Sequence, residues 1–307
     1  MRRQKGILTV TVSIAGMLLF GSGCKKNSTA PMLDSSINSN QDAAQSIANA
    51  IGEDNGGFTD QMGDIADATG ALGISQSVGS ASANGALLKT VAMKGDSVTN
   101  EFNASDTSWT VTVTRNRAGL LGRKASFTRM YYIKFINQDG VALPRYITNT
   151  TPADTASTIV FMVLNGTGYT VTRYLSTHLL SISSSYVASG TNTSVITVNG
   201  SFTRTGTDTV ETATTERVLT YTLEGTLQNV TRPRVPRYTI GSAIKRATGG
   251  TITGTYIATV SVLKGDSYSE RSFTKTFTVT FGDNSGSIDV GGAKFTCDLQ
   301  SGEAGSD

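Results

Sequence analysis

The sequence is poor in the residues from which most catalytic and metal-binding sites are built. It has one histidine and two cysteines, so a zinc site with several such ligands is not available, and we expect neither a metal nor a cofactor. A histidine-centred triad would have to use His178. The chain also has no phosphate-binding P-loop, no dinucleotide-binding glycine motif and no nucleophile elbow. These absences favour a non-enzymatic protein.

Two cysteines are also too few for a disulfide framework. One of them, Cys24, ends the N-terminal signal described below, which leaves Cys297 without a partner in the chain. Cys297 lies in a stretch that alternates between apolar and polar residues, so we expect it to be a small residue on one face of a strand. An intermolecular disulfide or a reactive thiol is the alternative.

An excess of positive charge is missing as well, once the N-terminal segment is set aside. The whole chain has 26 lysines and arginines against 23 acids. Three of the basic residues, Arg2, Arg3 and Lys5, belong to residues 1–23, which contain no acid, so 23 basic residues face 23 acids in the remainder. A general nucleic-acid binder keeps a surplus of positive charge, so we expect no nucleic-acid partner.

What the sequence does have is a recognisable start. The basic residues lead into an apolar run from Ile7 to Phe20, which is too short to span a bilayer and is typical of a secretion signal. Small residues and a cysteine follow. The segment Phe20-Gly21-Ser22-Gly23-Cys24 resembles the lipobox of bacterial lipoproteins.

The resemblance implies that residues 1–23 are a signal peptide and that Cys24 is acylated as the first residue of the mature chain. Lipid chains would then hold the protein at a membrane, which is its expected partner. Lys25 and Lys26 follow the cysteine, where an aspartate would favour inner-membrane retention in enteric bacteria. The resemblance therefore implies a lipid-anchored protein of the cell envelope, at the outer membrane.

The rest of the chain divides by composition. Residues 24–40 are rich in serine, asparagine and lysine and read as a flexible tether. Residues 41–85 form a helical segment and a loop, residues 86–300 form an antiparallel β domain, and residues 301–307 form a disordered tail.

Helical spacing is clear between Gln41 and Leu72. Apolar residues recur every three or four positions on both sides of Gly56-Gly57, which predicts two short amphipathic helices. We interpret their acidic residues as a solvated face, since the ligand spacing of a calcium-binding EF-hand loop, the alternative, is absent. These acids are Asp42, Glu53, Asp54, Asp60, Asp64 and Asp67.

Beyond the loop the dominant period is two. In the run from Phe273 to Phe281 apolar residues alternate with threonines, as an antiparallel strand with one wet face requires. Turn clusters divide residues 251–299 into a four-strand meander, with a hairpin at Val290-Gly291-Gly292-Ala293. We expect a mainly β fold: a large antiparallel, curved meander sheet or open barrel with a short N-terminal helical segment.

Two basic residues, Arg129 and Lys275, fall on the apolar faces of their predicted strands. Each ends a related motif, Ser126-Phe127-Thr128-Arg129 and Ser272-Phe273-Thr274-Lys275, and Ser201-Phe202-Thr203-Arg204 is similar. We expect these side chains to extend to an edge of the sheet, and the alternative is that they point into a ligand cavity.

Other basic residues are clustered along the chain. One run holds Arg115, Arg117, Arg123 and Lys124, and a second is the aromatic-basic stretch from Arg232 to Arg246. We interpret both as exposed loops that balance the acidic helices. The alternative is a site for anionic lipid headgroups or acidic glycans, with these candidates in the second cluster: Arg232, Arg234, Arg237 and Tyr238.

Three function classes remain open. The favoured one is a non-enzymatic envelope lipoprotein with a binding or structural role. A second is a carrier that holds a lipid or other apolar ligand on the concave face of the sheet. The third is a hydrolase of envelope polymers, which would need two carboxylates about 5–10 Å apart in a groove. Most acids after residue 72 fall near turns and are explained by turn chemistry, namely Asp139, Asp208, Asp266 and Asp283.

Overall fold

The computed structural model describes residues 38–70, 96–118, 124–147, 154–171, 175–212, 214–235, 246–282 and 285–306. Two helices, α1 (Ser39–Ile51) and α2 (Phe58–Gly70), come first. The strands that follow are β1 (Ser97–Asn103), β2 (Ser108–Ala118), β3 (Lys124–Ile136), β4 (Ala142–Leu143), β5 (Thr158–Val171), β6 (Ser176–Ser189), β7 (Val195–Glu211), β8 (Thr215–Pro233), β9 (Gly249–Lys264), β10 (Ser267–Gly282), β11 (Ser285–Val290), β12 (Ala293–Asp298) and β13 (Ala304–Ser306).

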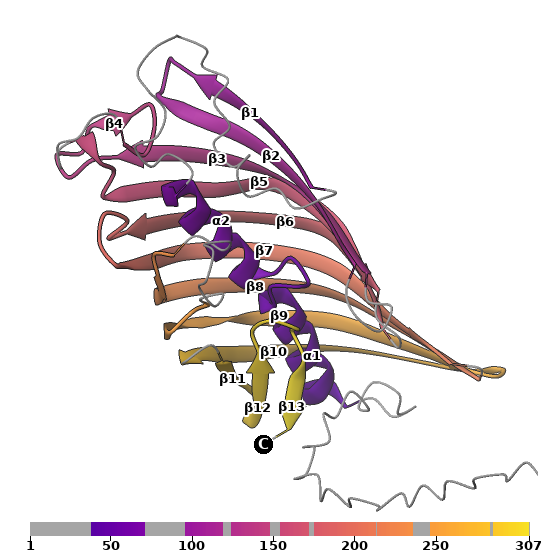
Figure 1. Ribbon diagram of the computed structural model, residues 1–307. Helices are drawn as coiled ribbons and strands as arrows, with labels where there is room; N and C mark the ends of the chain where they lie inside the picture. Colours follow the sequence, from indigo (N-terminus) through magenta and orange to yellow (C-terminus); the bar gives the residue numbers. More distant parts are fainter. Residues whose placement is uncertain are drawn as a thin grey trace, which may run out of the picture.

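All 13 described strands belong to one antiparallel sheet. Each strand pairs with its neighbour in sequence, apart from β4, which pairs only with β3 at the side of the main path. The sheet is open and strongly curved, and the two helices cross its concave face (Figure 1). The prediction of a large, curved antiparallel meander with a short helical segment is confirmed.

The alternation of residue types explains which face became concave. In β10 the aromatic and aliphatic side chains of Phe277, Val279 and Phe281 are buried, while of the threonines between them Thr278 is half-buried and Thr280 is exposed. Strands β9 to β12 form the predicted four-strand meander. The β11–β12 hairpin turns on Gly291 and Gly292, whose φ angles of 57° and 79° suit the two-residue turn that glycine favours.

The helices form where the apolar spacing predicts them. Asn38 caps α1, because its side-chain oxygen accepts a hydrogen bond from the backbone N–H of Gln41 at 3.3 Å. The apolar face of each helix joins the sheet in a single core. Phe58 of α2 illustrates this, since its ring centroid lies 5.9 Å from those of both Tyr186 in β6 and Phe281 in β10.

No helix among these described residues is long and apolar enough to cross a membrane. The two of them are instead part of the core that the sheet encloses on one side.

The C-terminal end differs from the prediction of a disordered tail over 301–307. Residues Ala304–Ser306 form β13, which pairs with β12. The side chain of Gln45 in α1 holds this segment from both sides, donating to the Gly302 carbonyl at 2.9 Å and accepting from the Ala304 N–H at 3.2 Å. The C-terminal residues are ordered by contacts with residues distant in the sequence. The composition of the tail alone therefore could not predict its structure.

The burial pattern of β10 predicts unequal effects for two adjacent substitutions. Phe277 is 4 % exposed and Thr278 lies on the opposite face. Phe277→Ala should lower the free energy of unfolding by about 3–5 kcal/mol, through lost burial and the cavity it leaves. Thr278→Ala should change it by about 0.5 kcal/mol or less. Denaturant melts of both variants measure this, and equal losses would mean that both faces of the sheet are covered.

Candidate functional site

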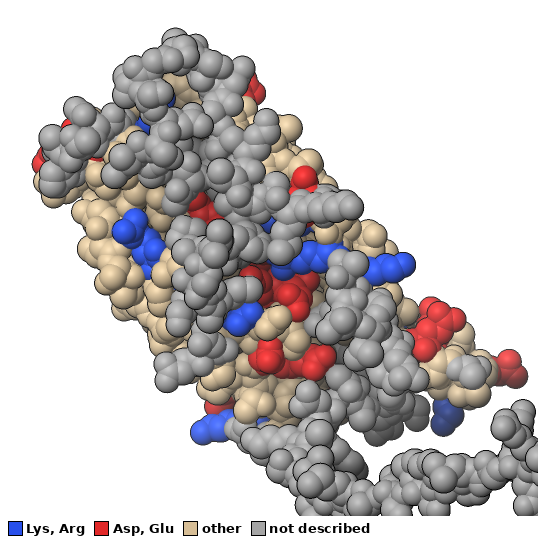
Figure 2. All heavy atoms as spheres, viewed as in Figure 1, with Lys and Arg blue, Asp and Glu red and all other residues tan. Residues whose placement is uncertain are grey.

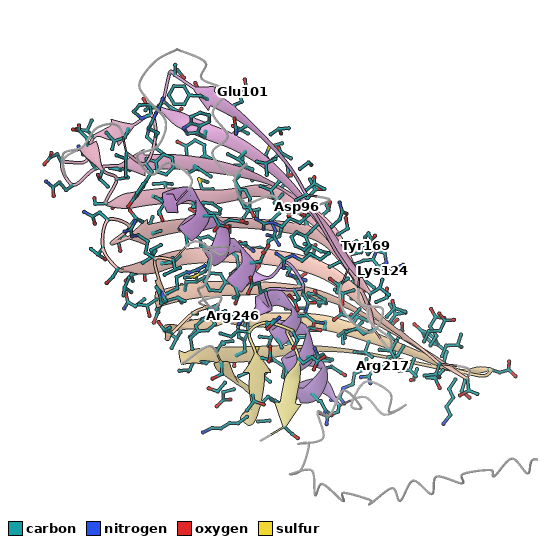
Figure 3. The ribbon with its side chains drawn as sticks, viewed as in Figure 1. Asp96, Glu101, Lys124, Tyr169, Arg217 and Arg246 are labelled. Atoms are coloured by element: carbon teal, nitrogen blue, oxygen red, sulfur yellow. The ribbon has the colours of Figure 1, made fainter. Side chains whose placement is uncertain are left out.

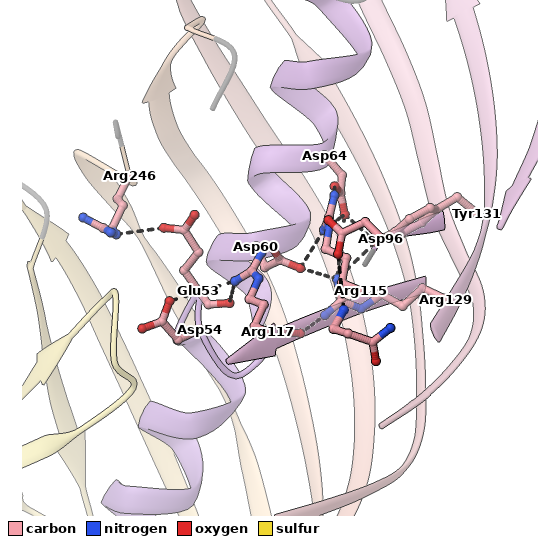
Figure 4. A network of polar contacts seen from close by, with 12 residues as sticks. Glu53, Asp54, Asp60, Asp64, Asp96, Arg115, Arg117, Arg129, Tyr131 and Arg246 are labelled. Carbon is pink, nitrogen blue, oxygen red and sulfur yellow. Dashed lines mark hydrogen bonds and ion pairs between the residues drawn. The ribbon is translucent and has the colours of Figure 1, made fainter. Parts of the chain in front are cut away.

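Five of the six acids of the helical segment are buried, so their interpretation as a solvated face is wrong, and only Asp54 is partly exposed. Asp60, Asp64 and Asp67 of α2 are 0 % exposed, and Asp42 of α1 is 1 % exposed. The acids face arginines on the concave side of the sheet, which come from strands far along the chain (Figure 4). Acidic and basic side chains accordingly gather where the helices cross the sheet (Figure 2).

Asp60 is the centre of the larger network. Its Oδ2 atom accepts hydrogen bonds from Nη1 of Arg115 at 2.9 Å and from Nη1 of Arg129 at 2.6 Å. Its Oδ1 atom accepts from Nη2 of Arg117 at 2.7 Å. One carboxylate thus binds three guanidinium groups, two from β2 and one from β3.

Asp64, one turn further along α2, completes this network. It forms an ion pair with Arg115 and accepts a hydrogen bond from the hydroxyl of Tyr131 at 2.5 Å. Burial raises the pKa of Tyr131, so its hydroxyl stays protonated as a donor. A further contact is the 3.0 Å bond from Arg246 Nε to Glu53 Oε2, next to the α1–α2 turn.

The location of Arg129 corrects a second expectation. We expected it to extend to an edge of the sheet, yet it is 1 % exposed beneath the helices. Burial alone would lower its pKa, but Tyr131 and the carboxylates of Asp60 and Asp64 raise that pKa above its ordinary value. The guanidinium also lies over the ring of Phe127, 4.6 Å from its centroid. The carboxylates that hold Arg129 in the core belong to α2. The periodicity of β3 therefore could not predict its burial.

A smaller polar cluster lies under α1. Asp42 pairs with Arg217 of β8, and Ser46 donates to Oδ2 of Asp208 at 2.8 Å. Burial raises the pKa of Asp42 to about 6, although Arg217 opposes the shift. Asp208 lies within β7 and is 1 % exposed, so turn chemistry does not explain it, and burial raises its pKa too. Its position follows from the pairing of β7 with β6 and β8, and its carboxylate contacts α1.

The first basic run is only partly as expected. Arg115 and Arg117 do balance the acidic helices, but they belong to β2 rather than to an exposed loop, and Arg115 is 4 % exposed. Lys124 is exposed at the start of β3, on the side of the sheet where Tyr169 also lies (Figure 3). Arg123 lies outside the described residues.

The second basic cluster is engaged within the fold where the structure describes it. Arg232 is 1 % exposed and donates from Nη2 to the carbonyl of Val235 at 3.1 Å. Arg234 donates from Nε to the carbonyl of Thr193 at 2.6 Å. The interpretation of these two as residues of an exposed loop is therefore wrong for Arg232, whose β8 position is covered. The remaining candidates, Arg237 and Tyr238, lie outside the described residues.

Three other residues named in the sequence analysis lie on strands outside the polar networks. Lys275 is half-buried in β10, on the same face as Phe277. Cys297 is 2 % exposed in β12, and burial raises the pKa of its thiol to about 12, which confirms a small residue on one strand face. His178 is exposed in β6, and its ring centroid is 6.5 Å from that of Tyr169.

The sequence pattern did not mark Arg204 as a site residue, although its motif resembles that of Arg129. It is 1 % exposed in β7 and borders a cavity of about 10 Å³ between the α1–α2 turn and the sheet. That volume suffices for about one water-sized particle. The cavity is lined by Asn55, Phe127, Gly168, Tyr169, Thr170, Thr177, Leu179 and Arg204.

Comparison of the chain with protein-family models, with curated proteins and with solved structures finds no significant match in any of the three.

The geometry around Asp60 predicts a large effect of one carboxylate. Asp60→Asn removes the carboxylate that three arginines share and leaves Asp64 as the remaining acid beside Arg115 and Arg129, so the free energy of unfolding should fall by about 3–5 kcal/mol. The matched control is Asp54→Asn, which affects a partly exposed acid 4.0 Å from Arg117 and should cost less than about 1 kcal/mol. Urea denaturation compares the two, and similar small losses would show that the network contributes little to stability.

Proposed function

We propose that this protein is a non-enzymatic, lipid-anchored protein of the cell envelope, with a binding role at the outer membrane. The N-terminal segment supports the location: a signal of residues 1–23, an acylated Cys24 and a short tether that leads to α1. The observation that carries the proposed role is the filling of the concave face.

A carrier or a hydrolase built on a curved sheet would bind its ligand on the concave face. Here that face packs against α1 and α2 in one core, and the cavity that remains at the α1–α2 turn is about 10 Å³. An acyl chain does not fit there. The carboxylates of Asp60 and Asp64 are both occupied by arginines, which leaves neither of them facing a substrate groove.

The carrier remains the second candidate for one reason. The concave wall is lined by aromatic and aliphatic side chains, including Trp109, Phe135 and Phe161, which would suit an apolar ligand if the helices were displaced. The charged contacts of α2 oppose such a displacement, because each buried arginine would lose its partner. The arrangement therefore favours a filled structural core over a carrier.

The convex face is the surface that the fold leaves for binding. Its residues lie in register across the strands, spaced about 4.7–4.9 Å apart. One row runs through six strands, and most of its members carry hydroxyl groups that both donate and accept hydrogen bonds. This row consists of Ser272, Thr259, Thr220, Thr207, His178 and Tyr169.

This row carries no acid, lysine or arginine, which favours a glycan over an anionic headgroup as its partner. Tyr169 is 44 % exposed beside His178, and the two rings are tilted by 33°. An exposed tyrosine offers an apolar ring face with a polar tip, which suits stacking on a sugar ring. The proposed partner is therefore an envelope glycan bound across the convex face.

The anchor is tested by changing one atom. Cys24→Ser removes the acylation site, so the protein should leave the membrane fraction and lose labelling by a fatty-acid analogue, because one or more acyl chains supply the membrane affinity. Cell fractionation with metabolic labelling measures both effects. Membrane retention of the variant equal to that of the natural protein would rule out the lipid anchor.

The binding surface is tested by co-sedimentation with purified peptidoglycan sacculi. The protein should sediment with them, and the Tyr169→Ala/His178→Ala double variant should bind about fivefold more weakly, since an aromatic contact is worth about 1 kcal/mol. Tyr268→Ala is the matched control, because Tyr268 is 63 % exposed on the β9–β10 hairpin outside this row. It should bind like the natural protein.

Absence of binding, or equal binding of all three proteins, would refute the glycan surface. The carrier hypothesis is tested by native mass spectrometry of the purified protein. A lipid that stays bound in stoichiometric amount would favour this second candidate.

A further inference from the structure

The sheet holds two equivalent buried arginines that differ in their partners. Arg129 and Arg204 occupy the last position of the same short motif, and each is 1 % exposed on the concave side. Arg129 binds Asp60 at 2.6 Å. For Arg204, in contrast, the structure records no ion pair with any described acid, and its one hydrogen bond joins Nε to the hydroxyl of Tyr221 at 3.3 Å.

The Nη1 atom of Arg204 has no hydrogen-bond partner among the described residues. A guanidinium stays protonated in a protein, so Arg204 brings a permanent positive charge into the core. Burial of a charge without a counter-charge is strongly unfavourable. An anion at this position would remove that cost.

The cavity lies where such an anion would have to sit. Arg204 forms part of its wall, together with the hydroxyl-bearing residues Thr170 and Thr177, which are 7 % and 5 % exposed. Asn55, in the turn between α1 and α2, lines it from the other side. At Gly168 a Cβ atom would come within 2.6 Å of the Ser126 carbonyl, so no side chain can fill the space from that position.

We propose that this cavity binds one monatomic anion of the size of chloride, held by the guanidinium of Arg204 and the hydroxyl group of Thr170. A cavity of about 10 Å³ excludes sulfate and phosphate. The proposal does not depend on the function proposed above.

The buried acid Asp208 is compatible with the proposed anion site. Asp208 is the register partner of Thr177, and its Oδ2 atom already accepts a hydrogen bond from Ser46. Burial raises the pKa of Asp208 and so reduces the negative charge that would repel an anion, although hydrogen bonds from Ser46 and Thr177 and the positive charge of Arg204 oppose this shift. Because Asn55 belongs to the helical turn, a bound anion connects α1 and α2 to β5, β6 and β7.

The test is urea denaturation of the full protein at constant ionic strength, with sodium chloride replaced stepwise by sodium gluconate, whose anion is too large for the cavity. An anion that binds only the native state raises the folding equilibrium constant by the factor 1 + [L]/Kd, which is about 11-fold at ten times Kd. The natural protein should show this saturable rise with chloride and bromide. Sulfate should not produce it.

Arg204→Met should abolish the chloride response while leaving the protein at least as stable as the natural one in gluconate, because the unpaired buried charge is gone. The matched control is Arg271→Met, which removes an exposed arginine of β10 from the same side of the sheet and should keep the full response. Should Arg204→Met fail to fold, Thr170→Val supplies the second variant, with a weakened response.

Anomalous diffraction from a crystal soaked in bromide locates the ion directly, and a peak beside Arg204 is the expected result. A natural protein whose stability is the same in chloride and gluconate would overturn the proposal, since a water molecule would then suffice at the site. A chloride response that persists in Arg204→Met, or a bromide peak only at other positions, would overturn it as well.

Discussion

The position of the helices depends on one buried carboxylate. Asp60 accepts hydrogen bonds from Arg115, Arg117 and Arg129, at distances between 2.6 and 2.9 Å, and so connects α2 to β2 and β3. A displacement of α2 away from these strands would leave the buried charges unpaired, which is far more costly than a displaced apolar contact. The network therefore fixes where the helices lie, while the apolar core around it supplies most of the burial.

The same arrangement limits where the protein can bind other molecules. A curved sheet has two faces, and the helical segment of this chain occupies the concave one through both apolar and charged contacts. The convex face keeps its rows of hydroxyl groups, with Tyr169 and His178 among them. We therefore propose the binding role for the convex face and a structural role for the core.

The buried arginines of the sheet differ in the partners of their guanidinium groups. Arg129 and Arg217 each have a carboxylate from a helix, whereas Arg204 lies beside a small cavity without one. Equivalent sequence motifs thus produced one internal ion pair and one candidate anion site. The two arginines differ because α2 places a carboxylate next to Arg129, and neither described helix places one next to Arg204.

Much of the fold follows from the sequence alone. Alternation of period two determined the strands, their wet and dry faces and the β9–β12 meander, and helical spacing determined α1 and α2, because both patterns depend on local geometry. The lipobox-like segment around Cys24 predicts the anchor in the same local way. Only the tertiary structure decided that the acids of the helices are buried, that Arg129 is held inside, and that β13 is ordered. These depend on contacts between residues distant in the chain, such as Asp60 with Arg115 and Gln45 with Gly302, whose partners no local pattern identifies.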